Sequence, residues 1–227
     1  MSWASLPIDA SLPEVRAALA SHRAAVVEAP PGTGKTTRVP PAVADAGRVV
    51  VLQPRRVAAR SVARRIADEQ GWALGREVGW HVRFDRRSSA DTRVLIVTEG
   101  MLTHYLDEDP LLTDVSTVIL DEFHERSLHT DVGLALVKEA WKARDDLRVL
   151  VMSATFDPEP VSAFLDGCPI LRGPGAVHPL QIEYTPGQTM TEAIEELVPA
   201  TTGHVLGFLP GAGEIERVLG ESADVAA

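Results

Sequence analysis

The run from Ala29 to Thr36, which reads Ala-Pro-Pro-Gly-Thr-Gly-Lys-Thr, constrains the fold of this chain more than any other feature. An apolar stretch precedes it, and the two prolines end the strand that this stretch predicts. Gly32 and Gly34 permit a tight curl in which successive backbone N–H groups point at an anion. A helix that begins near Lys35 would add its N-terminal dipole to the same site. The run therefore predicts a strand, a phosphate-binding loop and a helix in succession.

The side chains at the end of this run have separate expected roles. Lys35 would reach the β- and γ-phosphates of a nucleoside triphosphate, and the Thr36 hydroxyl would bind Mg²⁺. The pattern G-x-x-x-x-G-K-[ST] is met at every position except the first, which is Ala29. An ordinary strand–helix turn is the alternative reading, and the Lys-Thr pair in this context disfavours it. The residues predicted to hold the nucleotide are Gly32, Thr33, Gly34, Lys35, Thr36 and Thr37.

A second chemical signal, Asp-Glu-Phe-His over residues 121–124, follows another apolar strand. Asp121 would emerge at the phosphate edge of the sheet and bind Mg²⁺, usually through water. Glu122 is placed to orient and deprotonate an attacking water, and His124 can hydrogen-bond near the γ-phosphate. A solvated turn is the alternative for this segment alone. Together with the phosphate loop, the segment indicates hydrolysis of the nucleotide. The residues predicted to take part in catalysis are Glu122, Asp121, Lys35 and His124.

Apolar runs alternate with helical patterns through the first 173 residues. Continuous apolar strands separated by helices are typical of an α/β fold with a parallel sheet covered on both faces. The strands are expected at 25–27, 48–52, 93–98, 117–121 and 147–152, and the helices near 56–69, 100–107, 130–143 and 159–165. Ligands of such folds bind beyond the carboxyl ends of the strands. The residues expected to meet at that edge are Lys35, Gln53, Thr98, Asp121 and Ser153.

Composition places the chain among ordinary globular proteins. The 227 residues are 45% hydrophobic and 24% charged, and no apolar run is long enough to span a bilayer. The start of the chain lacks the pattern of a secretory signal. Cys168, the only cysteine, excludes an intrachain disulfide and is expected to be a buried small residue. We therefore expect a cytoplasmic protein with no membrane partner.

The net charge of −10 is unevenly distributed. Eight acidic residues and one basic residue lie in 174–227, so the acidity concentrates at the C-terminal end. Two basic clusters lie in the first part: one comprises Arg55, Arg56, Arg60, Arg64 and Arg65, and the other Arg83, Arg86 and Arg87. Such patches can bind phosphates on an acidic protein, and a solvated helix face with internal ion pairs explains them equally well.

The C-terminal part reads as a second, incomplete unit. Residues 174–179 are predicted to be a linker, and residues 180–227 a partial domain. Strands are expected at 180–184 and 204–209, with helices near 189–198 and 213–219. Two such strand–helix units are too few to close a core, so we expect the chain to be a fragment of a longer protein.

Six segments in this order resemble the successive motifs of superfamily 2 DEAH-type helicases, and most closely those of bacterial ATP-dependent helicases of the HrpB type. They are Ala29–Thr36, Gln53-Pro-Arg-Arg-Val-Ala-Ala59, Thr98-Glu-Gly-Met-Leu102, Asp121-Glu-Phe-His-Glu-Arg-Ser127, Ser153-Ala-Thr155 and Phe208-Leu-Pro-Gly-Ala-Gly-Glu-Ile215. The resemblance covers nearly the whole chain, and the ordered set is specific.

The resemblance implies a RecA-like P-loop NTPase domain at residues 1–173, followed by the incomplete start of a second RecA-like domain. In such proteins two domains clamp a single strand of nucleic acid and bind ATP, or another nucleoside triphosphate, with Mg²⁺. By this resemblance Arg55, Arg56, Thr98 and Gly100 would contact the nucleic-acid backbone, with RNA favoured over DNA. Ser153 and Thr155 would couple hydrolysis to unwinding. The oligomeric state is left open.

Two departures accompany the resemblance. Phe123 stands where DEAH relatives carry Ala, which should leave the metal and base roles unchanged. The late arginine motif of such helicases, Gln-x-x-Gly-Arg-x-Gly-Arg, does not occur after Phe208, so we expect this chain alone to hydrolyse ATP poorly. Two alternatives therefore stay open beside an ATP-dependent helicase: a small-molecule P-loop kinase, and a truncated nucleotide- and nucleic-acid-binding module without significant turnover.

Overall fold

The structure is a computed structural model of the chain that describes residues 4–154, 157–175 and 180–222. The chain divides into two compact units, Met1–Val177 and His178–Ala227, which are described separately. The domain boundary predicted at residue 173 remains a prediction, and residues 176–179 of the predicted linker lie outside the described residues.

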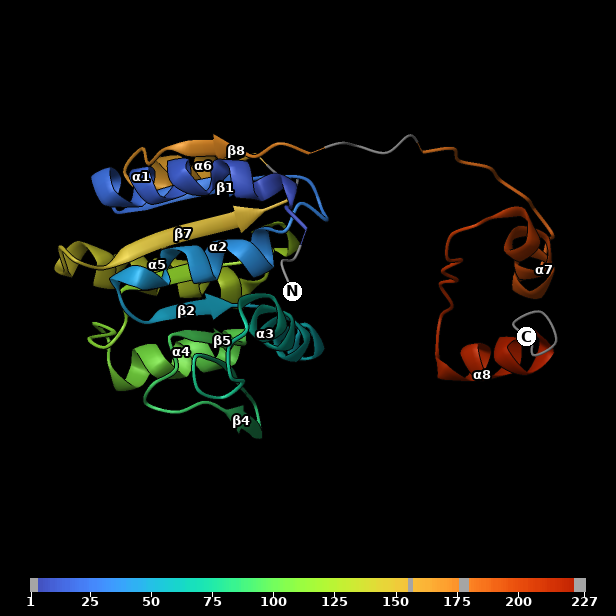
Figure 1. Cartoon of the computed structure of the whole chain (residues 1–227), viewed down its shortest axis with the longest axis horizontal. Helices are drawn as coiled ribbons and strands as arrows, with labels where there is room; N and C mark the ends of the chain where they lie inside the picture. Colours follow the sequence, from blue (N-terminus) through green and yellow to red (C-terminus); the bar gives the residue numbers. More distant parts are fainter. Residues whose placement is uncertain (1–3, 155–156, 176–179, 223–227) are drawn as a thin grey trace. The chain divides into compact units, whose positions relative to one another are not determined.

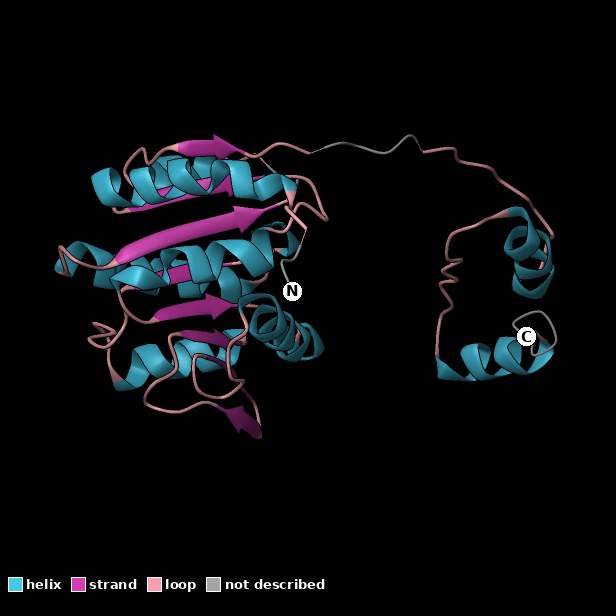
Figure 2. Ribbon diagram, viewed as in Figure 1, coloured by secondary structure: helices cyan, strands magenta, loops and turns pink. Residues whose placement is uncertain are grey.

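The first unit is built on one sheet, and Figure 2 shows its strands side by side. Neighbouring strands follow the order β4-β3-β5-β2-β6-β7-β1-β8, and every pair is parallel except β3 with β4. The predicted α/β fold with a parallel sheet is therefore confirmed. The strands are β1 (Ala24–Glu28), β2 (Val49–Leu52), β3 (Val78–Val82), β4 (Asp85–Arg87), β5 (Val94–Val97), β6 (Thr117–Leu120), β7 (Arg148–Ser153) and β8 (Ile170–Arg172).

Helices cover both faces of this sheet (Figure 1). The helices and 3₁₀ turns of the unit are η1 (Pro7–Ser11), α1 (Leu12–His22), α2 (Lys35–Val43), η2 (Ala44–Ala46), α3 (Arg56–Gln70), α4 (Glu99–Glu108), η3 (Phe123–Glu125), α5 (Leu128–Ala143) and α6 (Glu159–Phe164). Alternate strand residues point to opposite faces. Val49 and Val51 therefore join the core beneath α1, α2 and α3, whereas Val50 and Leu52 join the core beneath α4, α5 and α6. Both faces of the sheet are buried beneath helices, which explains why its strands are continuous apolar runs.

Apart from the 3₁₀ turns, the sequence patterns missed one helix and three strands of this unit: α1, β3, β4 and β8. The strand β3 carries the polar His81, and β4 is a charged three-residue segment, so neither has the apolar run of a central strand. Arg86 and Arg87, assigned to a basic cluster, lie in β4 at the edge of the sheet. Charged side chains on a short edge strand discourage pairing with another chain.

The second unit contains the two helices α7 (Met190–Ala200) and α8 (Ala212–Glu221), close to the predicted ranges. Thr189 and Glu192 cap α7 reciprocally. The two predicted strands at 180–184 and 204–209 were wrong, because neither segment pairs with a strand in the described part of the chain. A strand needs a neighbour for its backbone hydrogen bonds, and an apolar pattern does not supply one. In the described residues, no helix is long and apolar enough to cross a membrane.

Candidate nucleotide site

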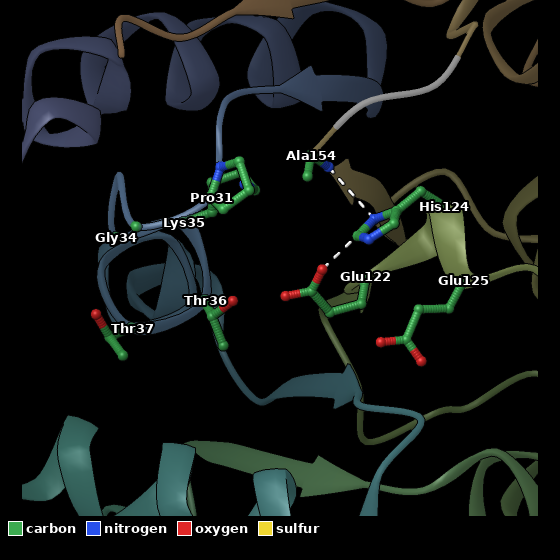
Figure 3. Close-up of a pocket in the computed structure, with 10 residues that line it drawn as sticks. Pro31, Gly34, Lys35, Thr36, Thr37, Glu122, His124, Glu125 and Ala154 are labelled. Carbon is green, nitrogen blue, oxygen red and sulfur yellow. Dashed lines mark hydrogen bonds and ion pairs between the residues drawn. The ribbon is translucent and has the colours of Figure 1, made fainter. Parts of the chain in front are cut away.

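The carboxyl edge of the sheet gathers the predicted nucleotide residues (Figure 3). The strands β1, β6 and β7 run parallel, so the loops that follow them leave the sheet at the same edge. These loops enclose a cavity of about 380 Å³. Its walls are Pro31, Gly32, Gly34, Lys35, Thr36 and Thr37 on one side, and Glu122, His124, Glu125 and Ala154 on the other.

The phosphate loop depends on glycine at its turn into α2. Gly34 caps the helix with φ of +94°, a conformation that L side chains rarely adopt. An added Cβ at Gly34 would lie 2.6 Å from Leu6 Cδ1, which is too close. Thr33 closes the loop, because its hydroxyl donates to the Pro30 carbonyl at 2.9 Å. Of the predicted nucleotide residues, Thr33 is buried and does not line the cavity.

The Lys35 ammonium lies inside the loop. The side chain is buried, and Nζ donates to the carbonyls of Ala29 at 2.5 Å and Pro30 at 3.1 Å. Burial lowers the pKa of Lys35, and the negative charges of Glu122 and Asp121 oppose that shift. The cation is therefore held by weak carbonyl partners beside the cavity, where phosphate oxygens would be stronger acceptors.

Asp121 follows β6 and is 1% exposed. Its Oδ2 accepts from the Thr36 hydroxyl at 2.7 Å and from Gln53 Nε2 at 3.3 Å. Oδ1 is buried and has no hydrogen-bond partner among the described residues. Burial, and then the nearby charge of Glu122, raise the pKa of Asp121 to about 7. A buried carboxylate oxygen without a partner, beside a threonine hydroxyl, fits the oxygen ligands that Mg²⁺ prefers.

Glu122 and His124 face the phosphate loop across the cavity (Figure 3). Glu122 has φ of +52°, an uncommon conformation for a residue other than glycine, and it precedes η3. Oε2 of Glu122 lies 3.5 Å from His124 Nδ1, which also accepts from the Ala154 N–H at 3.4 Å. His124 thus connects the predicted base to the end of β7.

The predicted nucleic-acid residues divide between two places. Arg56, Thr98 and Gly100 line a separate cavity of about 510 Å³, called here the Thr98 cavity. Its other lining residues are Pro54, Arg83, Glu99, Met101 and His129. Arg55 instead pairs with Glu125, with Nη2 and Oε1 2.9 Å apart, beside a cavity of about 400 Å³ that also borders Thr36 and Glu122. Adjacent arginines therefore face different sites.

Four charged or titratable residues of the nucleotide and Thr98 cavities had no assigned site role: Glu99, Glu125, Arg83 and His129. The sequence drew attention to Arg83 through its basic cluster, and to Glu125 and His129 through their proximity to the Asp-Glu-Phe-His run. Spacing alone does not show which cavity each of these side chains lines. The predicted coupling residue Ser153 is fully buried, and its hydroxyl lacks a partner among the residues described. Thr155 lies outside the described residues.

Cys168 is buried, and burial raises the pKa of its thiol to about 11. It is therefore a packing residue, as its apolar sequence context predicted.

The class of protein follows from family comparison. The model of the DEAD/DEAH box helicase family matches residues 13–164, and this chain belongs to that family. The match spans both the phosphate loop and the Asp-Glu-Phe-His segment, and it confirms the resemblance to DEAH-type helicases.

The chain is also similar to individual helicases and to their solved structures. The chain is 39% identical over 228 residues to the ATP-dependent RNA helicase HrpB of Escherichia coli K12, which covers 94% of this chain and 28% of the relative. A crystal structure of the Escherichia coli DEAH/RHA helicase HrpB superposes with a TM-score of 0.86 at 38% identity, covering 97% of this chain and 30% of that one. Another, of the E. coli DExH-box NTPase HrpB, gives 0.79 at 38% identity, with 99% and 29% covered. The chain thus spans less than a third of the length of these relatives.

Proposed function

We propose that this chain binds and hydrolyses ATP as the N-terminal part of an RNA helicase, with residues 1–173 as the first RecA-like domain. One observation carries the proposal: the phosphate loop and the Asp-Glu-Phe-His segment line the same 380 Å³ cavity from opposite sides. Nucleotide binding needs the first wall, and hydrolysis needs the second. Membership of the DEAD/DEAH box helicase family supports the same proposal.

The proposed mechanism uses five side chains of the chain itself. Lys35 exchanges its loop carbonyls for phosphate oxygens of ATP, with which its hydrogen bonds would be charge-assisted. Glu122 accepts the proton of the attacking water, and His124 lies beside it, with Nδ1 3.5 Å from Glu122 Oε2. Thr36 and Asp121 would hold Mg²⁺, which supplies positive charge against the phosphates.

The proposed second ligand is a single strand of nucleic acid, with RNA favoured over DNA. The Thr98 cavity combines Arg56 and Arg83 with the exposed backbone of Gly100, groups that suit phosphate contacts. The RNA preference rests on similarity to the E. coli RNA helicase.

Turnover of ATP by the Glu122→Gln variant tests this proposal. Gln keeps the shape of the side chain and removes the base, so turnover should fall by about 10²–10⁴ while ATP still binds. Glu108→Gln is the matched control, because Glu108 is an exposed acid at the far end of α4 and should leave turnover unchanged. Single-stranded RNA should raise the wild-type rate more than single-stranded DNA of equal length. Wild-type turnover by Glu122→Gln would refute the assigned base.

A further inference from the structure

One carboxylate joins the start of α4 to the start of α5. Oε1 of Glu99 accepts from the hydroxyl of Ser127 at 2.7 Å and from the hydroxyl of Thr130 at 2.6 Å. Ser127 is the N-cap of α5, and its oxygen accepts from the Thr130 N–H at 3.0 Å. Thr130 is buried and Glu99 is half-buried, so water competes weakly for these bonds.

Glu99, Ser127 and Thr130 are called here the Glu99 cluster. One end of this cluster lies beside the proposed nucleic-acid residues, and the other lies beside the proposed catalytic residues. Glu99 stands between Thr98 and Gly100, and all three line the Thr98 cavity. Ser127 follows directly on residues 121–126, here called the hydrolytic loop, which contains Glu122 and His124. The cluster is therefore a short polar connection between the nucleic-acid cavity and the loop that carries the base.

Contacts with several neighbouring elements hold the hydrolytic loop. Glu122 and Arg126 both have positive φ, at +52° and +38°, which are strained conformations for residues other than glycine. The surrounding structure must therefore hold the loop. Phe123 anchors its middle in the same apolar core as Leu102 of α4, and the Glu99 cluster fixes its C-terminal end. A shift of α4 would reach the loop through both contacts.

We propose that Glu99 is a positioning residue that couples occupancy of the nucleic-acid cavity to the placement of Glu122 and His124. The inference rests on the proposed function. It adds a connection on the α4 side of the cavity, separate from the predicted coupling residue Ser153 at the end of β7. Nucleic acid that contacts Thr98 and Gly100 shifts the first turn of α4, and the Glu99 carboxylate carries that shift to the N-cap of α5.

This coupling can be measured in the 227-residue chain by comparing RNA binding in the absence and in the presence of a nucleotide. The dissociation constant of a fluorescently labelled single-stranded RNA is determined without nucleotide and with a saturating, non-hydrolysable ATP analogue and Mg²⁺. The ratio of the two constants is the coupling factor, and couplings of this kind are typically about 5–150-fold. We expect a wild-type factor of at least about 5 by the same rule.

Three variants separate positioning from a general structural role. Glu99→Ala removes the acceptor and should bring the coupling factor to within about twofold of one, well below the usual range. Glu99→Gln keeps an oxygen that accepts both hydroxyls and should restore the wild-type factor. Glu108→Ala removes an exposed acid from the same helix and should leave the factor unchanged. Thermal unfolding midpoints, recorded for all three, show whether folding alone has changed.

The outcomes are distinguishable. A wild-type coupling factor in Glu99→Ala, or a wild-type factor of one, would overturn the positioning role. An equal loss of coupling in Glu99→Gln and Glu99→Ala would do the same, because the acceptor oxygen would not be what matters. Failure of the wild-type chain to bind the analogue or the RNA would instead overturn the proposed function, and this inference with it.

Discussion

The two units of the chain differ in where their apolar side chains lie. In the first unit, strand residues such as Leu150 and Val151 are fully buried between the sheet and its helices. In the second unit, Leu206 and Phe208 are 77% and 83% exposed. Both segments have apolar sequences, so hydrophobicity alone does not produce a core. Strand partners decide the difference, because a paired strand can bury both its backbone and its side chains.

The two units also differ in which of them carries the predicted nucleotide-binding and catalytic residues. Every described residue that lines the nucleotide cavity belongs to the first unit. Its loops start from buried parallel strands, which hold Asp121 and Ser153 at fixed positions. A site for phosphate transfer needs such placement, since small displacements of catalytic groups reduce rates strongly.

The largest expected contrast is in hydrogen exchange. Amides of the central strands β1, β2, β6 and β7 should exchange at least about 10³ times more slowly than those of α7 and α8, because core strands open only on global unfolding. Helices of 10 or 11 residues are marginal without packing, and Val218 is the only buried apolar residue that the second unit shows in its described part. Exchange should be followed by mass spectrometry at neutral pH. If the amides of residues 180–222 were protected from exchange as strongly as those of the central strands, the proposed difference between the two units would be wrong.

A matched pair of leucines should show the same contrast in stability. Leu150→Ala creates a cavity in the first core and should lower the free energy of unfolding by about 2–5 kcal/mol. Leu206→Ala removes an exposed side chain and should change it by less than about 0.5 kcal/mol. Urea titration followed by circular dichroism gives both values. Similar losses for the two variants would mean that Leu206 is packed in solution.

The reactivity of the Cys168 thiol at a chosen pH also tests the difference in burial between the two units. The pKa of Cys168 is raised to about 11, so its reactive thiolate forms only as the pH rises toward that value. At pH 8, iodoacetamide should modify Cys168 at least about 10² times more slowly than an exposed cysteine of ordinary pKa. The Cys168→Ser, Leu206→Cys double variant supplies that exposed cysteine in the second unit. Comparable rates would contradict the burial of Cys168.

The smallest expected effect concerns the Arg55–Glu125 ion pair within the first unit. Arg55 is 73% exposed, and exposed pairs contribute about 0–1 kcal/mol. Glu125→Gln should therefore change the unfolding free energy by less than about 1 kcal/mol, which denaturant titration can resolve. A larger loss would show that this pair helps to hold the hydrolytic loop.

The sequence predicted the parts of this fold that have a periodic apolar pattern or a glycine-dependent turn. The phosphate loop, Asp121 and the central strands belong to that group. It did not predict β3, which carries Gly79 and His81, or β4, whose charged residues lie at the edge of the sheet, nor the absence of strands at 180–184 and 204–209. The opposite directions of Arg55 and Arg56 were also beyond sequence analysis, because helix and loop geometry decide which cavity each side chain meets.

Calorimetric titration of Mg·ATP into residues 1–177 alone tests the central claim most directly, namely that the phosphate loop and the Asp-Glu-Phe-His segment of the first unit bind the nucleotide. The account predicts an affinity within about twofold of the 227-residue chain, since the phosphate loop and the Asp-Glu-Phe-His segment both lie within the first unit. Lys35→Ala, measured beside it, should weaken binding by about 10-fold or more, because a charged hydrogen bond contributes about 1.5–3 kcal/mol. Loss of binding by residues 1–177, or full affinity in Lys35→Ala, would contradict the account.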